Sequence, residues 1–496
     1  MAQYVADTDA DRLSADADWD VLYVDGETER GERAALEVDD PTTEEVFATV
    51  PAATEDDVNA AYERAAEAGS EWAERPPQAR AAVIEDAIGI VEGHRETMLD
   101  LLATEAGSAL VKGNAELDTA VGMMREAASF PTRVGGTVKD SIVPGKENLV
   151  KREPAGVVGV ISPWNFPFHL SMRAVAPALA LGNGVVLKPA STTPITGGLL
   201  LARIFEAAGL PEGLLNVVPG HGSEIGDRMA GHPEADVIAF TGSTAVGKRV
   251  AGRAVEHLAY PAMELGGNNP HVVLDDADLD RAVDSAVFGT FLHQGQVCIS
   301  INRHLVHESL YDEYVERLAD RAADLTVGDP HDPDTVIGPI IDDDQRDQMM
   351  AYVEETVEQG ATVETGGDHD GRFVQPTVLS GATNDMSAAC NEHFGPVAPV
   401  IPFSDDGEAI ELANAVDQGL AASVHSTDRE RAEAVADRID AGMVHVNDQP
   451  INDEPHVPFG GVKDSGIGRF NDEYVMEEMT RTKWVSVQRE EREYPF

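Results

Sequence analysis

A cysteine in a polar segment is the first residue of this sequence whose type and position suggest chemistry. Cys298 ends the segment HQGQVC, residues 293–298, and the chain has one other cysteine, Cys390, which we interpret as a structural bystander. The segment is too polar for an ordinary core strand, so a buried structural thiol and a nucleophile are both open. Because a free thiol, with a pKa of about 8.5, is mostly protonated at pH 7, a nucleophile needs nearby N–H dipoles, a cation or a base. His293 could be that base, although a packed or solvent-facing histidine is the alternative.

Two further stretches contain polar side chains suited to acyl chemistry. In ISPWNFPFH, Pro163 and Pro167 would stiffen the loop and fix the carboxamide of Asn165, which could then donate to an oxyanion. An Asx turn with aromatic packing is the alternative. In MELGGNNP, Glu264 precedes two glycines, and a carboxylate in a dry loop can have a raised pKa and serve as a general base. Taken alone, such a glutamate is more often a surface carboxylate.

A glycine loop, FTGSTAVGKR, follows a strand pattern and precedes a helix pattern. Gly242 and Gly247 would let the backbone approach a phosphate at the helix N-terminus, although a merely tight turn is the alternative. Residues 242–248 also fit the start of a P-loop, but Arg249 stands where a P-loop needs Ser or Thr for magnesium. The loop therefore predicts a phosphate-bearing ligand and argues against nucleoside triphosphate hydrolysis.

A lysine stands at the end of another strand pattern. Lys188 begins KPAS after an apolar run, and a cation at the carboxyl end of a strand suits a phosphate or a ribose hydroxyl. A surface lysine is the alternative. Lysines are scarce, with 8 against 28 arginines, and Lys188, Lys248 and Lys463 all fall in glycine- or proline-rich stretches.

The overall charge excludes several classes of partner. The chain has 36 basic and 89 acidic residues, a formal net charge of −53, spread along its whole length, so nucleic acid and anionic membranes would be repelled. An acidic, lysine-poor surface is typical of proteins from salt-loving organisms. No cluster of cysteines and histidines has metal-ligand spacing, no leader is evident, and no apolar run approaches the roughly 18 residues of a membrane span. We expect no metal and a soluble, reducing, cytoplasmic setting.

The elements that must position these residues alternate in type. Residues 54–130 are predicted to be helical, with Thr54 as an N-cap and Val58, Ala61, Tyr62 and Ala65 on one face. From about residue 131 the pattern becomes that of an extended ribbon. Alternating strand and helix patterns then predict a parallel sheet covered by helices, followed by a second such set to about residue 441. Ligands of such sheets bind beyond the carboxyl ends of the strands.

Together the motifs closely resemble the aldehyde dehydrogenase superfamily, from about residue 20 to residue 488. They stand in the order and spacing of that family: ISPWNFP, LKPAS, FTGSTAVGK, MELGGNNP, HQGQVC, EHFGPV and PFGGVKDSGIGR. The stretches SVHSTDRERAEAVADRIDAGMVHVND and INDEPHVPFGGVKDSGIGRF are similar to the branch that acts on benzaldehyde- or vanillin-like aldehydes.

The resemblance implies an α/β fold with a Rossmann-like cofactor domain, an α/β catalytic domain and a β-ribbon for oligomerisation. The implied ranges are 1–130 and 151–261 for the dinucleotide-binding domain, 262–441 for the catalytic domain, 442–479 for a C-terminal loop and helix that return to the active site, and 131–150 with 480–496 for the ribbon and tail. It also implies a homodimer or a homotetramer.

The same resemblance assigns roles. Cys298 would attack the aldehyde, Asn165 and the Cys298 N–H would hold the oxyanion, and Glu264 would activate the water that hydrolyses the thioester. The cofactor would be NAD or NADP. The residues implied to bind it are Ile161, Trp164, Lys188, Ser191, Gly242, Ser243, Gly247, Leu265, Glu392 and Phe394.

Two departures from the family pattern bear on these roles. Ser191 stands where many NAD-preferring members carry a glutamate that repels the 2′-phosphate of NADP, which leaves the preference between the two cofactors open. Phe470 stands where some members carry a second acidic residue, which favours Glu264 as the sole base.

The substrate is predicted less directly. An apolar pocket near Phe166, Phe168, Met172 and Phe291 would fit an aromatic aldehyde; short aliphatic or sugar-derived semialdehydes are the alternatives, and no arginine is evidently placed for a substrate carboxylate. Three other functions remain as rivals. They are a dehydrogenase that passes the acyl group to coenzyme A, which Glu264 disfavours, a P-loop nucleotidase, which Arg249 disfavours, and a structural protein without activity.

Overall fold

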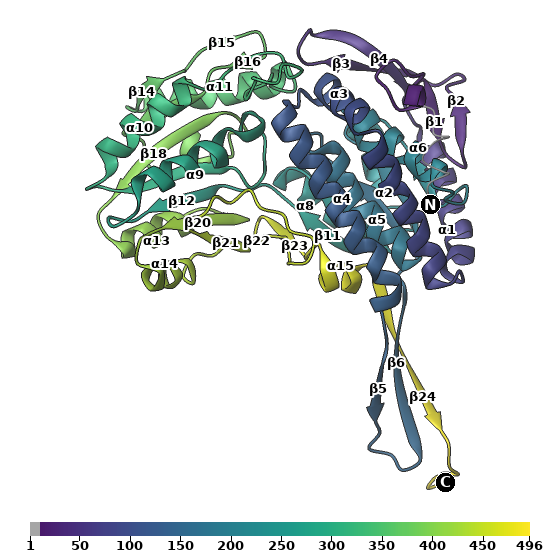
Figure 1. The fold of residues 1–496 in the computed structure, drawn as a ribbon. Coiled ribbons are helices and arrows are strands. Elements are labelled where there is room, and N and C mark those ends of the chain that lie inside the picture. The colour runs from purple at the N-terminus through teal and green to yellow at the C-terminus, as the bar shows by residue number, and fades with distance from the viewer. Residues whose placement is uncertain (1–9) are drawn as a thin grey trace.

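The computed structural model describes residues 10–496, which form two α/β lobes and a β-ribbon that projects away from them (Figure 1). Residues 1–9 of the predicted first segment lie outside the described residues. Each lobe is built around its own sheet, so the predicted α/β class is confirmed. Among the described residues, no helix is both long and apolar enough to cross a membrane.

The first sheet has eight strands, and its five central strands, β9 to β11 in spatial order, run parallel. Central strands such as β7 and β8 are runs of buried apolar residues because helices cover both faces. In spatial order the strands are β2 (Glu27–Glu29), β1 (Val21–Tyr23), β9 (Leu215–Val217), β8 (Gly184–Lys188), β7 (Val157–Ile161), β10 (Val237–Thr241), β11 (Tyr260–Glu264) and β23 (Gly466–Ile467).

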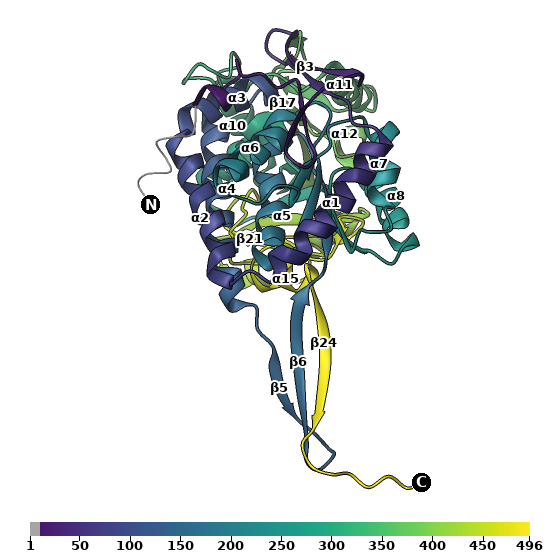
Figure 2. The same cartoon turned by 90° about the vertical axis from the view of Figure 1, so that its right-hand side faces the viewer.

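Helices cover the two faces of this sheet. Successive strand residues point to opposite faces, so Val157 packs with α1, α7 and α8 whereas Val158 packs with α2, α4, α5 and α6. Figure 2 shows α2 and α4 on one side of the lobe and α7 and α8 on the other. The helices are α1 (Glu55–Ala73), α2 (Pro77–Gly93), α3 (Arg95–Ala106), α4 (Leu110–Arg133), α5 (Pro167–Leu181), α6 (Leu200–Ala207), α7 (Gly222–Ala230) and α8 (Thr244–Glu256).

The first of these helices begins at the residue that the sequence predicted. The Thr54 side chain accepts from the Asp57 N–H, and the Asp57 carboxylate accepts from the Thr54 N–H at 2.8 Å, which is a capping box. The four residues of the predicted apolar face are all buried. Helix α1 therefore lies on the sheet as its 3.6-residue periodicity requires.

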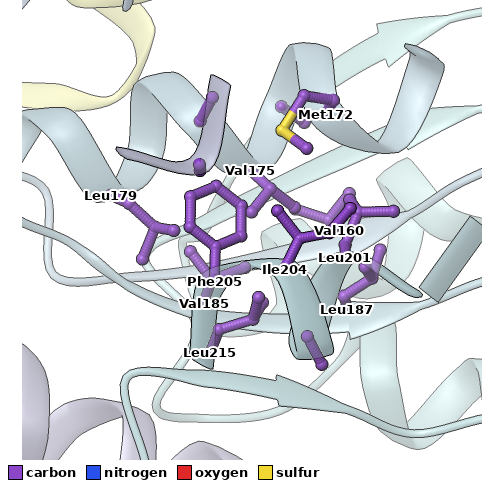
Figure 3. Close-up of a cluster of buried hydrophobic side chains, with 14 of the residues drawn as sticks. Val160, Met172, Val175, Leu179, Val185, Leu187, Leu201, Ile204, Phe205 and Leu215 are labelled. Carbon is purple, nitrogen blue, oxygen red and sulfur yellow. The ribbon is translucent and has the colours of Figure 1, made fainter. Parts of the chain in front are cut away.

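The core beneath α5 and α6 holds the site-bearing strands in place. Figure 3 shows Phe205 of α6 among the side chains of α5 and of β7, β8 and β9. Val160, Leu187 and Leu215 come from those three strands. Because protein interiors are close-packed, these contacts fix where the strands end.

The second sheet has seven strands, all parallel to their neighbours except β14 at one edge. Its strands, in spatial order, are β14 (Thr362–Thr365), β17 (Thr377–Ser380), β18 (Val397–Phe403), β13 (Ile301–His307), β12 (Asn269–Val273), β20 (Ala421–His425) and β21 (Met443–Val446). Its helices are α9 (Leu279–Phe291), α10 (Tyr311–Ala323), α11 (Asp343–Glu358), α12 (Ser387–Cys390), α13 (Asp406–Asn414) and α14 (Arg429–Ala436).

The ribbon is a three-stranded antiparallel sheet in the order β24-β6-β5, and the chain ends at its far end (Figure 1). Its strands are β5 (Thr137–Asp140), β6 (Lys146–Pro154) and β24 (Thr480–Gln488), with α15 (Asp472–Glu478) leading into β24. The remaining elements are the strand pairs β3 (Ala35–Asp40) with β4 (Glu45–Pro51), β15 (His369–Asp370) with β16 (Phe373–Val374) and β19 (Gln418–Gly419) with β22 (Val462–Lys463), and the short helices Ala10–Arg12, Ile195–Leu199 and Leu292–Gly295.

The predicted segment boundaries shift at three places. Residues 262–264 belong to the first sheet, because β11 stays paired with β10 as far as Glu264. Residues 443–446 belong to the second sheet, beyond the predicted end at 441, because β21 pairs with β20. The ribbon strand β6 continues to Pro154, because its pairing with β24 reaches Thr480.

Replacing Phe205 tests the role of the core beneath α5 and α6. The Phe205→Ala variant should lose about 3–5 kcal/mol of unfolding free energy, because the fully buried ring leaves a cavity. Urea midpoints measure the change, with Val255→Ala on the exposed face of α8 as the control, for which the expected change is within about 0.5 kcal/mol. Equal midpoints for the two variants would contradict this account.

Candidate active site

Three predicted site residues lie where adjacent parallel strands of the first sheet end, at one edge of that sheet. Strand β7 ends shortly before Asn165, β10 ends directly before Gly242, and β11 ends at Glu264. Cys298 enters from the second lobe. They line a cavity of about 310 Å³, whose walls are Pro163, Trp164, Asn165, Thr241, Gly242, Ser243, Glu264, Leu265, Gly266, Cys298, Gln345, Gln348, Glu392 and Phe394.

The loop before the thiol has an unusual backbone. His293, Gln294 and Gly295 all have positive φ values, of 53°, 57° and 72°. At position 295 a Cβ would lie 2.1 Å from the Gly395 carbonyl oxygen, so only glycine fits. The Gln294 amide donates to the Pro339 carbonyl at 2.8 Å, and the Gln296 side chain accepts from the Ile341 N–H at 3.0 Å. The polar character of HQGQVC thus holds a strained turn in place.

His293 is not a base for the thiol. The hydrogen bonds described for residues 10–496 include none to its two buried ring nitrogens, and its ring packs edge-on against Phe166 at 5.6 Å between centroids. Burial, with a smaller contribution from the charge of Lys112, lowers the pKa of His293 well below its ordinary value. The histidine is therefore neutral and packed, which was the alternative interpretation.

The Asn165 carboxamide is fixed against the nucleophile loop. It is 3% exposed, and its Nδ2 donates to the Gln296 carbonyl oxygen at 2.9 Å. A carboxamide has two N–H donors, so the second stays available beside Cys298. The Asx turn that was the alternative interpretation is absent from the hydrogen bonds described for this side chain. Asn165 is placed to donate to an oxygen that develops negative charge near the thiol.

Glu264 is a buried carboxyl without partners. It is 2% exposed, and neither of its oxygens has a hydrogen-bond donor within residues 10–496. Burial raises its pKa well above the ordinary value, and the nearby charges of Arg173 and Arg469 oppose that rise. Gly460 leaves the space for this carboxyl, because a Cβ there would lie 2.7 Å from its Oε1. Such a group takes up a proton more readily than an ordinary exposed carboxylate.

Comparisons with known proteins identify the family of this chain. Residues 28–485 match the aldehyde dehydrogenase family. The chain belongs to that family. It is 47% identical to benzaldehyde dehydrogenase YfmT of Bacillus subtilis over 96% of this chain and 98% of the relative, and 49% identical to vanillin dehydrogenase of Corynebacterium glutamicum over 90% and 93%. Betaine aldehyde dehydrogenase of Staphylococcus aureus, solved in complex with NAD+, superposes with a TM-score of 0.94 at 33% identity over 99% of both chains.

The protein is thus an NAD(P)-dependent aldehyde dehydrogenase, and its glycine loop leads into a helix N-terminus at the edge of the cavity. Ser243 is the N-cap of the 13-residue helix α8, and its hydroxyl makes no capping hydrogen bond. The first-turn N–H groups of α8 therefore face the cavity edge, where Gly242 and Ser243 are part of the wall. Gly247 of the same loop also has a packing role. A Cβ there would lie 2.1 Å from Leu265, so this glycine lets α8 pack on the segment after β11.

The strand-end lysine lies beside this edge. Lys188 is buried at the end of β8, opposite Ile161 of β7, and its ammonium donates to the Pro189 carbonyl at 3.1 Å. Burial lowers the pKa of Lys188 to about 8. Ser191 follows it in a half-buried turn. Lys188, Ile161 and Ser191 lie outside the wall of the 310 Å³ cavity but continue the same sheet edge.

The opposite wall of the cavity comes from the second lobe of the aldehyde dehydrogenase. The Glu392 carboxylate accepts from the Gly267 N–H at 3.1 Å, and burial raises its pKa to about 7. Phe394, with a φ of 50°, contacts the Trp164 ring edge-on at 5.4 Å between centroids. Glu392, Phe394 and Trp164 are all part of the cavity wall.

The four residues predicted to form the substrate pocket lie in different surroundings. Phe166 packs, as Cys298 does, against a small cluster that includes Val297 and Phe459. By contrast, Phe168 and Met172 are fully buried in the core beneath α5, and Phe291 is buried in the core of the second lobe. The apolar face of a helix turns toward its sheet, which removes these three side chains from the cavity.

Sequence reasoning missed several residues of the site. Gln345 and Gln348 of α11 line the cavity, and nothing in the acidic segment DDDQRDQMM signals this. Arg173 carries a signal that could have been used, because it is the one formal charge in the apolar helix α5. It is 3% exposed, and its charge acts on both Cys298 and Glu264.

The thiol itself is protonated in the protein described. Burial raises the pKa of Cys298 to about 12; the charge of Arg173 opposes this, whereas Glu392 and Glu264 add to it. Its backbone is fixed separately, since the Asn269 amide donates to the Cys298 carbonyl at 2.8 Å. Reaction therefore requires loss of a proton from the thiol in the same site that contains the buried carboxyl of Glu264.

The Glu264→Gln variant should be more stable than the wild type at alkaline pH. A carboxyl whose pKa is raised by folding contributes stability that is present below its unfolded pKa and is lost as pH rises through the folded value. Glutamine does not ionise, so the gain in Tm should be small near pH 4.5 and should grow toward pH 9.

Melting curves across this range measure the difference, with the exposed Glu63→Gln of α1 as the control. A Tm gain that shrinks with rising pH would contradict the assignment of a raised pKa to Glu264.

Proposed function

We propose that the protein oxidises an aromatic aldehyde to its carboxylic acid with NAD(P)+, through a thioester on Cys298. One observation carries this proposal: Cys298, Asn165 and Glu264 line the same cavity as the glycine loop and Glu392. A nucleophile, an oxyanion donor and a base therefore meet beside a phosphate-binding helix N-terminus.

In the first step the Cys298 thiol passes its proton to the ionised Glu264, which releases it to solvent before deacylation, and the sulfur forms a bond to the aldehyde carbon. The carbonyl π electrons move to oxygen, and the free N–H of Asn165, with the backbone N–H of Cys298, stabilises the resulting oxyanion. The hydrogen bond to Gln296 keeps the amide from rotating, so little reorganisation accompanies the step.

Bound NAD(P)+ supplies the acceptor for the hydride that leaves the substrate carbon as the oxyanion collapses to a thioester. The residues that would hold it are Gly242 and Ser243 at the pyrophosphate, Lys188 and Ser191 at the adenosine ribose, and Glu392 at the nicotinamide ribose. Trp164, Leu265 and Phe394 complete the wall. Ser191 carries no charge to repel a 2′-phosphate, which supports use of either cofactor.

Glu264 then serves as the general base. A water attacks the thioester carbon while Glu264 takes one of its protons; the carbon–sulfur bond breaks, the acid leaves, and the thiol is restored. The raised pKa makes this buried carboxyl, when ionised, a stronger base than an ordinary carboxylate. Aldehyde, NAD(P)+ and water thus give acid, NAD(P)H and one proton.

The aromatic substrate class has two supports. The rings of Phe166 and Phe459 pack in the same small cluster as Cys298, which offers flat apolar surface beside the nucleophile. The two relatives described above are named benzaldehyde and vanillin dehydrogenases. Oxidation rates with benzaldehyde, hexanal and succinic semialdehyde, each with NAD+ and with NADP+ in molar salt, would rank the alternatives.

The rival functions have less support. Lys248 of the P-loop-like stretch is exposed and bonds to Asp464 at 2.6 Å, and Arg249 bonds to Asp227 at 2.7 Å. Neither faces the cavity. Transfer of the acyl group to coenzyme A would require Glu264 to leave water inactive, and production of an acyl-CoA with little free acid would favour that rival.

We also propose that the ribbon joins copies of this chain into a dimer or tetramer. Val138 of β5, Ile142 of the loop between β5 and β6, and Trp484 of β24 expose 70%, 102% and 69% of their surface. Large exposed apolar residues on an open-edged sheet mark a surface that another strand can cover.

The Cys298→Ala variant should lose dehydrogenase turnover by more than about 10³-fold, because no covalent intermediate can form. The matched control is Cys390→Ala, which removes the other free thiol from an exposed position on α12. Steady-state NAD(P)H production measures both variants. Substantial turnover in Cys298→Ala, or equal losses in the two variants, would reject Cys298 as the nucleophile.

The Glu264→Gln variant should release one equivalent of NAD(P)H rapidly and then turn over about 10²–10⁴-fold more slowly, because the thioester persists without a base. In the wild type the deacylation rate should rise with pH, since the base acts only when ionised and its pKa is raised.

Rapid mixing and mass spectrometry of the intact protein detect the thioester. The comparison is Glu478→Gln, a second buried carboxyl whose pKa is raised to about 8 mainly by burial. Thioester accumulation in that variant but not in Glu264→Gln would assign the base to Glu478 instead.

A further inference from the structure

An arginine is buried between aromatic rings beside the reaction centre. Arg173 of α5 is 3% exposed, and its guanidinium carbon lies 4.4 Å from the centroid of the Phe459 ring and 5.0 Å from that of Phe470. Phe459 also packs in the cluster that contains Cys298 and Phe166. One aromatic ring therefore contacts both the arginine and the group around the nucleophile.

Most of the donors of this arginine are unused. Its Nη1 donates to Asp453 Oδ2 at 3.1 Å, and within residues 10–496 no other acceptor is bonded to the guanidinium. A guanidinium has five N–H donors. Asp453 is meanwhile shared, since it also bonds to His169 at 3.0 Å and to Asn471 at 2.8 Å.

An undersatisfied buried cation is costly unless something completes its hydrogen bonds. Its stacking on two rings satisfies the faces of the guanidinium but leaves its edge for an oxygen ligand. The positive charge of Arg173 also acts at the reaction centre. It favours lower pKa values for Cys298 and Glu264, against the rise that burial causes. The guanidinium therefore lies near enough to the catalytic groups for its charge to act on both of them.

We propose that Arg173 binds an oxygen at the end of the substrate opposite the reacting aldehyde, and that this oxygen is the phenolic one of a hydroxybenzaldehyde. The inference rests on the proposed oxidation at Cys298 and names the substrate class more closely. An anionic oxygen could equally come from the carboxylate of a semialdehyde. The aromatic surfaces of Phe166, Phe459 and Phe470 favour a ring between the aldehyde and the bound oxygen.

The test measures one ratio, kcat/KM for 4-hydroxybenzaldehyde divided by kcat/KM for benzaldehyde. In Arg173→Met, kcat/KM for 4-hydroxybenzaldehyde should fall about 10-fold to 100-fold relative to kcat/KM for benzaldehyde, as expected for the loss of a charge-assisted hydrogen bond. The isosteric 4-methylbenzaldehyde, which lacks the oxygen, should behave like benzaldehyde. Succinic semialdehyde tests the carboxylate as the alternative source of the oxygen.

Two further variants separate substrate binding from support of the fold. Arg173→Lys keeps a charge for Asp453 but loses the planar fork, so it should fold and still show a reduced ratio. Asp453→Asn removes the competing charge and should raise the ratio. A merely structural arginine would lower all rates together and leave the ratio unchanged.

The matched control is Arg203→Met. Arg203 is also buried, bonds to Glu27 at 2.7 Å and stacks over Trp19 at 4.0 Å, but it belongs to the core near the N-terminal strands. Its loss should lower Tm without changing the ratio.

Three outcomes would overturn the inference. These are an unchanged ratio in both folded Arg173 variants, a loss confined to succinic semialdehyde, and an equal change of the ratio in Arg203→Met. Each leaves benzaldehyde oxidation, and hence the proposed function, intact. Absence of aldehyde oxidation in the wild type would instead overturn the proposed function itself.

Discussion

The hydrogen bond from Asn165 to the Gln296 carbonyl joins the two lobes at the point where chemistry is proposed. Asn165 follows a strand of the first sheet, and Gln296 belongs to the loop that leads into the second. At 2.9 Å this bond sets the carboxamide and the Cys298 loop in one fixed relation. Without it, the second N–H of the amide would have no defined direction, and an oxyanion site depends on donors that are already oriented.

The buried carboxyls of this protein divide into paired and unpaired groups. Glu116 bonds to Lys112 at 2.5 Å and accepts from the N–H groups of Phe168 and His169, so it caps the start of α5 beside Asn165. Glu105 similarly accepts from the N–H of Ile195 at 2.8 Å. Such carboxylates support the fold.

Glu264 lies in an equally buried position and has no such donor. The difference leaves the oxygens of Glu264 free to accept a proton from a water, whereas those of Glu105 and Glu116 already accept from backbone N–H groups. The unpaired state of Glu264 is maintained by the packing around it, including the space left by Gly460. Glu264 thus keeps its carboxyl oxygens without hydrogen-bond donors at the place where the proposed reaction transfers a proton.

Much of the fold follows from local patterns. The capping box at Thr54 and the apolar periodicity after it predicted α1, and the alternating strand and helix patterns predicted the parallel sheet. The segment boundaries were less accurate, because the ends of β6, β11 and β21 are fixed by pairing with strands distant in the sequence. The assignment of Phe168, Met172 and Phe291 to the pocket also failed, since a pattern of apolar residues does not reveal which apolar surface faces a core.

The sequence by itself determined which residue types are present for chemistry: a lone polar-flanked thiol, a loop-fixed amide, a glutamate before glycines and a glycine loop that begins a helix. Their motifs have fixed order and spacing, so they identify a family. Only the tertiary structure decided which of them meet, that His293 is packed and neutral, and that Arg173 lies beside the site with an unused edge. These properties depend on burial and on contacts between distant segments, and neither is encoded in the spacing of residues along the chain.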